Sequence, residues 1–377
     1  MPTGYKPIYK IMKDGADITD RFNDRTISIK VELKNGGGEP DTFDIILDDR
    51  DFKIERPEIK SKLEIYMGYE ELGYSQLGRF ELQQVNYIGP PKAMRLTGTS
   101  IEFSGQIKTP ILKDHSQKTL GEIIGEIAKA GGQSPVIAPE LEKMKIPFFN
   151  QNFSPLHMLH ELERRYGAIA KFDMGHLIFM PRDKGESFSG QGLPLLQLRP
   201  EHFGSWDIKE DKRTEYTGTK AAYRDPVDHA IKWIEHFNPL GKAQDDADGA
   251  KPENDSPFRI PKMHNSKEEA EAAAKSMMGS LNRALGDGTI TLAKGDPWIK
   301  DQFPVIISGM RPGINGSYIA NSVIHEYTKP VGIKTTMLIK PSGEGEDFAP
   351  LADDGYPTTK ELGGLALDHA GRVRGGV

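Results

Sequence analysis

The sequence predicts a mainly β protein in which a small α+β unit separates two β-rich parts. Three observations support this fold class. Apolar and polar residues alternate through much of the first hundred residues, which is the period of half-buried strands. The spacing then becomes helical in the middle of the chain, and strand-like alternation returns in the second half. The expected boundaries are 1–110 for the first β-barrel or sandwich, 111–182 for the α+β unit, 183–202 for a linker, 203–340 for the second β unit and 341–377 for a flexible tail.

The first unit contains at least five short strands. Alternating runs begin at Ile27, Phe43, Leu63, Phe80 and Met94. Glycine-rich or acidic turn residues separate these runs. Many short strands between turn residues are typical of a barrel or a sandwich.

The middle unit contains two helices and a hairpin. Apolar residues from Leu120 to Ala128 recur at helical spacing, and two glycines follow. Ser154 suits an N-cap, Pro155 suits the first helical position, and Gly167 suits the end of this second helix. Two strand-like runs around Gly175 then predict a β-hairpin.

The second β-rich unit is interrupted by one loop and one helix. Its expected strands lie at 206–208, 216–223, 288–293, 305–307, 318–327 and 334–340. Residues 238–265 have almost no apolar pattern and predict a mobile loop. Ser266 and Glu269 fit a capping box, so we expect a helix over 266–286. Two β-rich units in one chain suggest a structural duplication.

Composition excludes several classes of protein. The chain of 377 residues has no cysteine, which excludes disulfides, thiolate nucleophiles and cysteine zinc sites. No apolar run approaches the ~18 residues of a membrane span, so we expect no stable membrane insertion. The N-terminus lacks the apolar stretch of a secretory signal. A net charge of -6 argues against a general nucleic-acid binder.

Motifs for catalysis or metal binding are weak. His157, His160 and Glu161 form His-x-x-His-Glu, whereas a zincin needs His-Glu-x-x-His on one helical face. Asp246 and Asp248 lack the other ligands of a calcium loop. Phosphate-binding loops and a nucleophile elbow are also missing from the sequence. We therefore expect no catalytic, metal or cofactor site, and a function that lies in assembly surfaces.

Several stretches resemble one family when they are taken in order. They are Ile18–Phe22, Asp41–Asp49, Leu63–Tyr69, Gly78–Leu82 and Leu96–Ser100, then Lys118–Ile124, Ile146-Pro147, Leu159–Leu162, Tyr166-Gly167 and Gly175–Phe179, then Tyr216–Gly218 and Gly288–Leu292. Over about residues 7–340 the chain resembles the late control protein D family of contractile-tailed phages, the tail or baseplate hub. That family is similar to the N-terminal part of type VI secretion VgrG proteins. The acidic loop at 238–265 departs from relatives in which this region is basic, and the tail has no clear counterpart.

The resemblance implies a non-enzymatic symmetry adaptor. Each chain of such a hub carries two tube-protein-like β-barrels, and three chains form a pseudo-sixfold ring that initiates the tail tube. The implied partners are two further copies of this chain, the tail tube protein, the central spike, the tape-measure protein and surrounding baseplate proteins. DNA passes through the lumen without specific binding, so we expect a neutral or acidic lining. The implied location is the virion baseplate, assembled in the bacterial host cytoplasm.

The tail supplies candidate docking residues, and alternatives to the hub remain. The spaced apolar residues of the tail are Phe348, Leu351, Tyr356, Leu362, Leu365 and Leu367. They are candidates for docking on the spike or on a neighbouring hub subunit, and a disordered end is an equal alternative. Other readings of the whole chain are a hub with peptidoglycan hydrolase activity, a type VI secretion spike component and a carbohydrate-binding sandwich.

Overall fold

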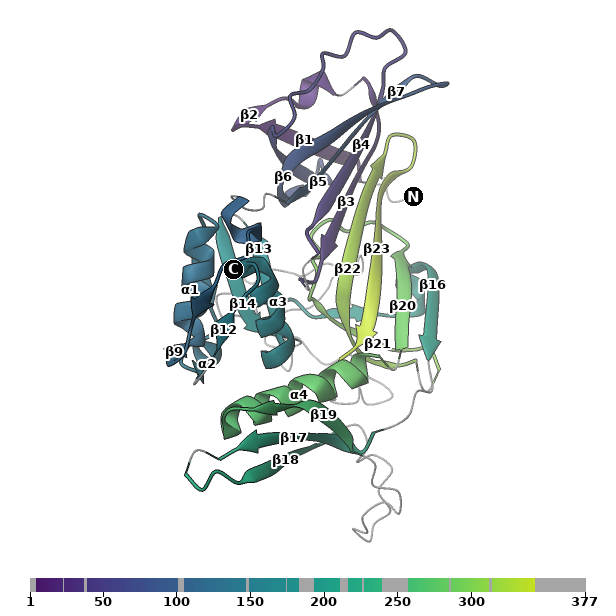
Figure 1. The fold of residues 1–377 in the computed structure, drawn as a ribbon. Coiled ribbons are helices and arrows are strands. Elements are labelled where there is room, and N and C mark those ends of the chain that lie inside the picture. Colours follow the sequence, from purple (N-terminus) through teal and green to yellow (C-terminus); the bar gives the residue numbers. More distant parts are fainter. Residues whose placement is uncertain are drawn as a thin grey trace.

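The protein consists of one large β-sheet and two smaller units beside it (Figure 1). The computed structural model describes residues 5–22, 24–36, 39–100, 105–146, 149–173, 175–182, 193–210, 216–225, 227–238, 257–284, 286–311 and 314–342. The six apolar residues of the tail lie outside these ranges. In the described part of the chain, no helix is both long and apolar enough to span a membrane.

The large sheet has thirteen strands. Eleven of them follow the order β16-β20-β23-β22-β3-β4-β7-β6-β5-β1-β2. The other two lie off this path, where β21 pairs with β22 and β15 pairs with β21. From the first part of the chain come β1 (Pro7–Lys13), β2 (Ala16–Asp17), β3 (Thr26–Lys34), β4 (Thr42–Asp48), β5 (Lys62–Tyr69), β6 (Gly73–Ile88) and β7 (Ala93–Ser100). From the second part come β15 (Leu196–Leu198), β16 (Phe203–Glu210), β20 (Gly286–Leu292), β21 (Pro304–Ile307), β22 (Gly316–Thr328) and β23 (Gly332–Pro341).

The two β-rich parts of the chain are joined by hydrogen bonding. Strand β22 pairs antiparallel with β3, in a register that runs from Ser322 opposite Lys34 to Thr328 opposite Ser28. A single apolar core contains buried side chains of both parts. The prediction of two separate closed barrels is therefore not confirmed, because the described strands form one continuous sheet.

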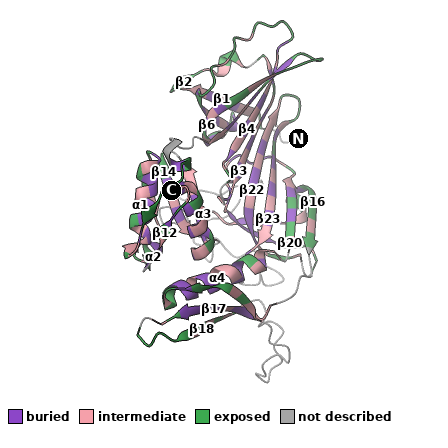
Figure 2. Cartoon of the chain, in the orientation of Figure 1, coloured by how far each residue is buried: buried purple, intermediate pink, exposed green. Residues whose placement is uncertain are grey.

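The alternation read from the sequence is confirmed in the first part, with one exception. Phe43, Ile45 and Leu47 are buried, as expected, and the half-buried Asp44, Ile46 and Asp48 lie on the other face. Figure 2 shows buried and less buried positions alternating along the strands of the sheet. Ile27 was expected in the core but is exposed. The register between β3 and β4 shifts next to it, so that Thr26 is buried in its place.

The two helices and the hairpin expected in the middle of the chain are confirmed, with the caps of the second helix. The small α/β unit contains α1 (Leu120–Ala130), α2 (Pro139–Glu142), α3 (Pro155–Tyr166), β8 (Lys113–Asp114), β9 (Lys118–Thr119), β10 (Ser134–Ile137), β11 (Lys145–Ile146), β12 (Asn150–Gln151), β13 (Ala168–Asp173) and β14 (His176–Pro181). The hydroxyl of Ser154 accepts a hydrogen bond from the backbone N–H of His157 at the start of α3. Gly167 ends this helix in the left-handed conformation, with φ +60°.

The structure corrects three predictions about residues 183–340. Within the expected linker, β15 is a buried strand that pairs parallel with β21. Within the expected mobile loop, 258–264 form β19 (Phe258–His264), which pairs parallel with β17 (Gly218–Arg224). Strands β17, β18 (Ile231–Phe237) and β19 form a separate sheet packed on α4 (Lys267–Arg283), rather than part of a barrel. Its strands alternate too weakly in sequence to reveal the parallel pairing.

A buried ion triad holds the large sheet against the α/β unit. The ammonium of Lys171 on β13 lies 3.3 Å from a carboxylate oxygen of Asp41 and 2.7 Å from one of Asp301. Asp41 precedes β4, and Asp301 lies between β20 and β21. Gly36 is required at the same contact, since a Cβ there would lie 2.5 Å from Ile169.

We expect Lys171→Met to lower the free energy of unfolding by about 3–5 kcal/mol, because it leaves two buried carboxylates without their cation. Urea unfolding followed by circular dichroism measures this loss. Lys6→Met is the matched control, since Lys6 pairs with Glu70 at the surface and its loss should change little. Equal stability of the two variants would contradict a structural role for the triad.

Two buried groups change the stability of the fold in opposite directions as the pH falls. Burial raises the pKa of Asp41 to about 6, above its ordinary 3.8, so its protonation stabilises the folded chain between these values. Burial lowers the pKa of His325 to about 3, below its ordinary 6.5, so acid destabilises the fold through this histidine. The side chain of His325 is held between the hydroxyl of Thr335 and the carbonyl of Ile299.

We expect Asp41→Asn to lose stability more steeply than the native chain as the pH falls from about 6 to about 4, because the compensating protonation is removed. Asparagine keeps the side-chain oxygen that accepts the N–H of Lys34. Unfolding midpoints measured across this pH range give the slope. If the unfolding midpoints of the two proteins fell in parallel with pH, the raised pKa of Asp41 would be refuted.

Candidate assembly surfaces

The face of the large sheet that turns away from the core is polar, and its charges balance. We define the polar face as the outward side chains of β16, β20, β23, β22, β3, β4, β7 and the second half of β6. Its bases are Lys30, Lys34, Arg95, Lys209, Lys334 and Lys340, and its acids are Glu32, Asp44, Asp48, Asp207, Asp287 and Glu326. Six bases and six acids give a net charge of zero. Between them lie Ser, Thr, Asn and Gln, together with the apolar Ile46, Ile88, Ile324 and Leu338.

Charges of opposite sign lie opposite each other where the two β-rich parts meet. Lys334 on β23 pairs with Glu326 on β22, which pairs with Lys30 on β3, which pairs with Asp44 on β4. Opposite charges on directly paired positions favour one register, and a slip would bring like charges together. Arg95 on β7 adds a fork contact, with its Nε 2.9 Å from both oxygens of Asp44. The row of charges thus helps to fix the β22–β3 junction.

Two open strand edges flank the polar face in the described part of the chain, in addition to the open edges at β1–β2 and at β15. Strand β16 pairs only with β20. The second half of β6, residues 83–88, pairs only with β7, because β5 pairs with the first half. Soluble chains usually block long open edges with lysine, proline or bulges, since open edges pair with other chains.

Each open edge also exposes an aromatic side chain on the core side of the sheet. Trp206 on β16 is opposite buried Ile290 and is 50% exposed. Tyr87 on β6 is opposite buried Met94 and is 59% exposed. A neighbouring strand at either edge would cover these rings. The two edges are therefore alike in side-chain chemistry as well as in their free backbone groups.

The residues singled out for metal binding do not form a metal centre. His160 on α3 contacts the buried carboxylate of Glu163 at 2.8 Å, and Glu161 pairs with Arg164. In the ranges that the structure describes, no group of three or more His, Asp or Glu side chains could hold a metal ion. Asp246 and Asp248 lie outside the described residues.

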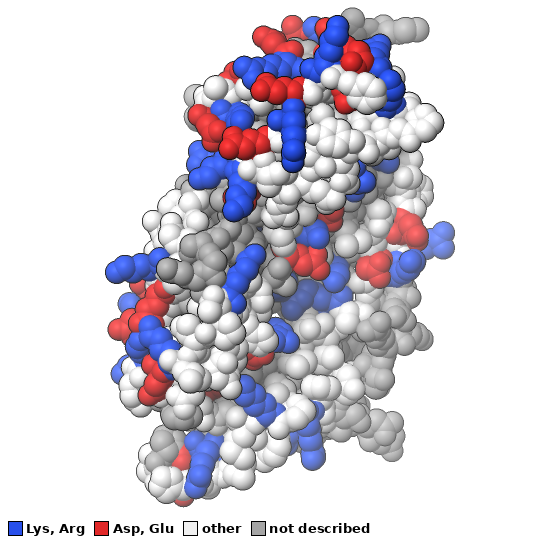
Figure 3. Space-filling model, turned by 45° about the horizontal axis from the view of Figure 1, so that its top comes forward, with Lys and Arg blue, Asp and Glu red and all other residues white. Residues whose placement is uncertain are grey.

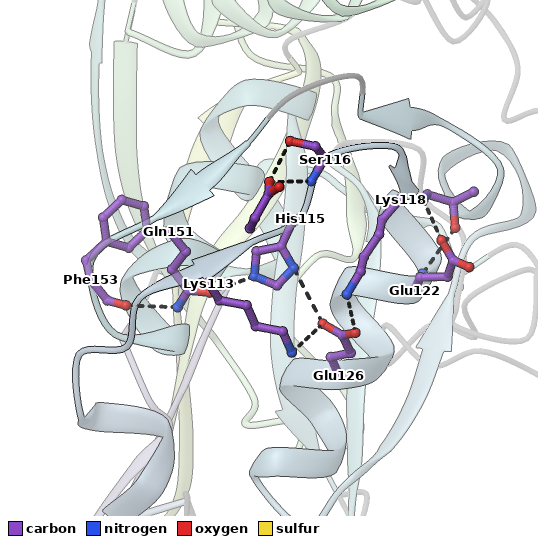
Figure 4. Close-up of polar contacts among 10 residues, drawn as sticks. Lys113, His115, Ser116, Lys118, Glu122, Glu126, Gln151 and Phe153 are labelled. Atoms are coloured by element: carbon purple, nitrogen blue, oxygen red, sulfur yellow. Dashed lines mark hydrogen bonds and ion pairs between the residues drawn. The ribbon is translucent and has the colours of Figure 1, made fainter.

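One polar cluster in the α/β unit was missed by the sequence reasoning (Figure 4). The buried ring of His115 lies 2.8 Å from the side-chain oxygen of Gln151 and 3.4 Å from the carboxylate of Glu126. Glu126 also contacts the ammonium groups of Lys113 and Lys118, at 3.0 Å and 2.5 Å. These contacts tie α1 to the short β8 and β9 strands. We interpret the cluster as structural, and its partners lie too far apart in sequence to form a recognisable motif.

On the face shown in Figure 3, the described residues of the upper half carry charges of both signs. Blue and red side chains are interspersed on the upper half of the molecule in Figure 3. A cavity of roughly 360 Å³ between the first strands and the α/β unit is likewise lined by both signs, including the Glu64–Arg79 pair at 3.0 Å. Neither feature selects a ligand of one charge.

The chain is similar to known phage proteins over nearly its whole length. It is 26% identical to the probable baseplate hub protein of Escherichia phage 186 over 351 residues, which covers 86% of this chain and 90% of the relative. It is also 26% identical to the probable baseplate hub protein of Escherichia phage P2, over 89% of this chain and 93% of the relative. No protein-family model matches the chain.

Solved structures share the fold at low sequence identity. The 43 kDa tail protein of prophage MuSo2 from Shewanella oneidensis has a TM-score of 0.63 and 11% identity, covering 90% of this chain and 99% of that one. The E. coli protein c3393, described as a type VI secretion component similar to the T4 tail proteins gp27 and gp5, has a TM-score of 0.52 and 10% identity, covering 90% and 79%. The resemblance predicted from the sequence is thereby confirmed: this chain is a relative of the baseplate hub proteins of phage tails.

Proposed function

We propose that three copies of this chain form a ring that adapts a sixfold tail tube to a threefold spike. The observation that carries the proposal is the pair of open, aromatic edges at β16 and β6. They lie on opposite sides of a block of eight strands, β16-β20-β23-β22-β3-β4-β7-β6. An edge that pairs with a different edge of the next copy gives a heterologous contact, and such contacts close into rings.

The block of eight strands divides into two sectors of four at the β22–β3 pair. One sector comes from each β-rich part of the chain. Three chains then present six sectors in a ring that has only threefold true symmetry. A sixfold tube can bind the six sectors on one side, while a threefold spike binds the three chains on the other.

The polar face suits the lining of a central passage. Its net charge of zero gives phosphate groups no cationic track, so DNA can pass without being held. From the sequence we expect a lining mostly of Asp, Glu, Ser, Thr and Asn. The polar face has as many bases as acids, so as a lining it would be neutral and richer in Lys and Arg than expected. The passage would carry the tape-measure protein and DNA through the baseplate of the virion, after assembly in the host cytoplasm with tube, spike and other baseplate proteins.

We propose no enzymatic activity for the chain. The relatives from phages 186 and P2 are named as hub proteins, and the charged groups examined above are paired with one another. A hydrolase would need a general acid and a base or nucleophile that converge on a substrate cleft. The function rests instead on the open strand edges.

We expect the native chain to have a solution mass of about three times the 41.9 kDa of one chain. Trp206→Lys and Tyr87→Lys should each shift the mass to that of a monomer, because a lysine at either edge opposes strand pairing and removes a buried ring. Light scattering after size-exclusion chromatography measures the mass, and circular dichroism confirms that the variants are folded.

Leu112→Lys is the matched control, since Leu112 is 88% exposed and lies in the α/β unit away from both edges. It should leave the mass unchanged. A native monomer at micromolar concentration would refute the ring. A stable trimer in which both edge variants assemble normally would refute the edge pairing but not the trimer.

A further inference from the structure

A basic groove lies between α3 and α4, where the α/β unit meets the second helix-and-sheet unit (Figure 1). Its volume is roughly 820 Å³. The bases that line it are Arg164, Arg165, Arg182, Lys262, Arg283 and Lys340. The two acids of the lining are Glu161 and Glu163, and Glu269 pairs with Arg165 behind the lining, which leaves an excess of three positive charges with the histidines neutral.

Not every base of the groove has an acidic partner. Glu161 is paired with Arg164, at 2.6 Å. Glu163 is buried, and its carboxylate is hydrogen-bonded to His160 and to the backbone N–H of Ala170. Lys262 is exposed and has no acidic partner within 4 Å in the described part of the chain. The groove therefore attracts an anionic occupant.

Two buried polar groups of the lining have no hydrogen-bond partner among the described residues. One is Nη1 of Arg165, whose side chain is only 9% exposed and whose Nε is paired with Glu269 at 3.1 Å. The other is Nε2 of His264, which is 3% exposed. Nη1 of Arg165 is a buried donor, and leaving it without an acceptor is costly, whereas the role of Nε2 of His264 as donor or acceptor depends on its tautomer.

The opposite side of α4 has a different charge. A second groove of roughly 970 Å³ there is lined by four acids, Glu140, Glu235, Glu268 and Glu271, against three bases, Arg182, Lys275 and Arg283. The two grooves meet at Gly167, Arg182, Ser276 and Arg283, which line both, and the excess of bases is confined to the first. An acidic segment would bind on the basic side only.

We propose that the acidic start of the chain's own tail, residues 344–354, binds in this basic groove. The described chain ends at Ser342, two residues beyond Lys340, which itself lines the groove. The next residues include five acids, Glu344, Glu346, Asp347, Asp353 and Asp354, and no lysine or arginine before Lys360. A segment of opposite charge therefore starts at the mouth of the groove.

Length and apolar spacing fit the same occupant. At about 3.4 Å per extended residue, Phe348 can reach roughly 27 Å from Lys340, about the length of the seventeen-residue α4. Phe348 and Leu351 lie between the two groups of acids. Ile260 and Met277 of the lining offer apolar surface to them. The bound segment would brace α3 against α4, independently of the ring.

Cysteine cross-linking tests this in the full chain, which has no cysteine of its own. Ser280 is exposed and lines the basic groove, so we pair Ser280→Cys with Ala349→Cys. Under mild oxidation we expect a disulfide within one chain, seen as a mobility shift without a change of mass on a non-reducing gel. Lys262→Glu with Lys340→Glu, or 1 M salt, where the Debye length is about 3 Å, should lower the yield several-fold.

Glu271→Cys on the acidic side of α4 is the matched control, and it should form little disulfide with Ala349→Cys. Equal yields from both sides of α4, or no disulfide, would overturn the proposal. A disulfide between two chains would also overturn it, in favour of a neighbour's tail. A higher yield from Ala247→Cys than from Ala349→Cys would assign the groove to the acidic internal segment instead.

Discussion

The pairing of β22 with β3 is the interaction on which the rest of the structure depends. It joins strands that are almost 300 residues apart, as in the contact between Ser322 and Glu32, 290 positions apart. Closing so long a loop costs conformational entropy, which the shared core and the cross-strand charges must offset. The pairing makes one sheet of the two β-rich parts, and it brings their four-stranded sectors side by side. The proposed doubling of three chains into six sectors follows from it.

The smaller units are attached to this sheet through few, specific contacts. Asp41 comes from the first β-rich part, Asp301 from the second and Lys171 from the α/β unit. The contacts among them therefore form only when all three parts are correctly placed. A buried ion pair adds little net stability over an apolar contact, but it is costly to break and it restricts geometry. Gly36 allows the close approach that the triad needs. These contacts set the orientation of the α/β unit, and hence the groove between α3 and α4.

The surface differs from that of a typical monomer at two strand edges, which have no pairing partner in the described part of the chain. The polar face is well balanced, with charges paired across strands. The edges at β16 and β6 each expose an aromatic ring and pair on one side only, although β16 carries Lys209 and both strands contain a register shift. Evolution usually avoids this combination because open edges aggregate. It is expected of a protein whose edges are covered by assembly. The basic groove is similar on a smaller scale, since the buried Nη1 of Arg165 has no acceptor among the described residues.

The sequence by itself determined the local structure. Alternation at Phe43, Ile45 and Leu47, and the caps at Ser154 and Gly167, depend on neighbours within a few residues, so they were read correctly. Only the tertiary structure decided how β22 meets β3, that 196–198 and 258–264 are strands, and that Lys171 lies between two acids. Those outcomes depend on partners distant in the chain, and short strands paired in parallel leave no periodic signal of their own. The tertiary structure also decided the assembly surfaces, because a strand edge is open only when no other strand of the fold pairs with it.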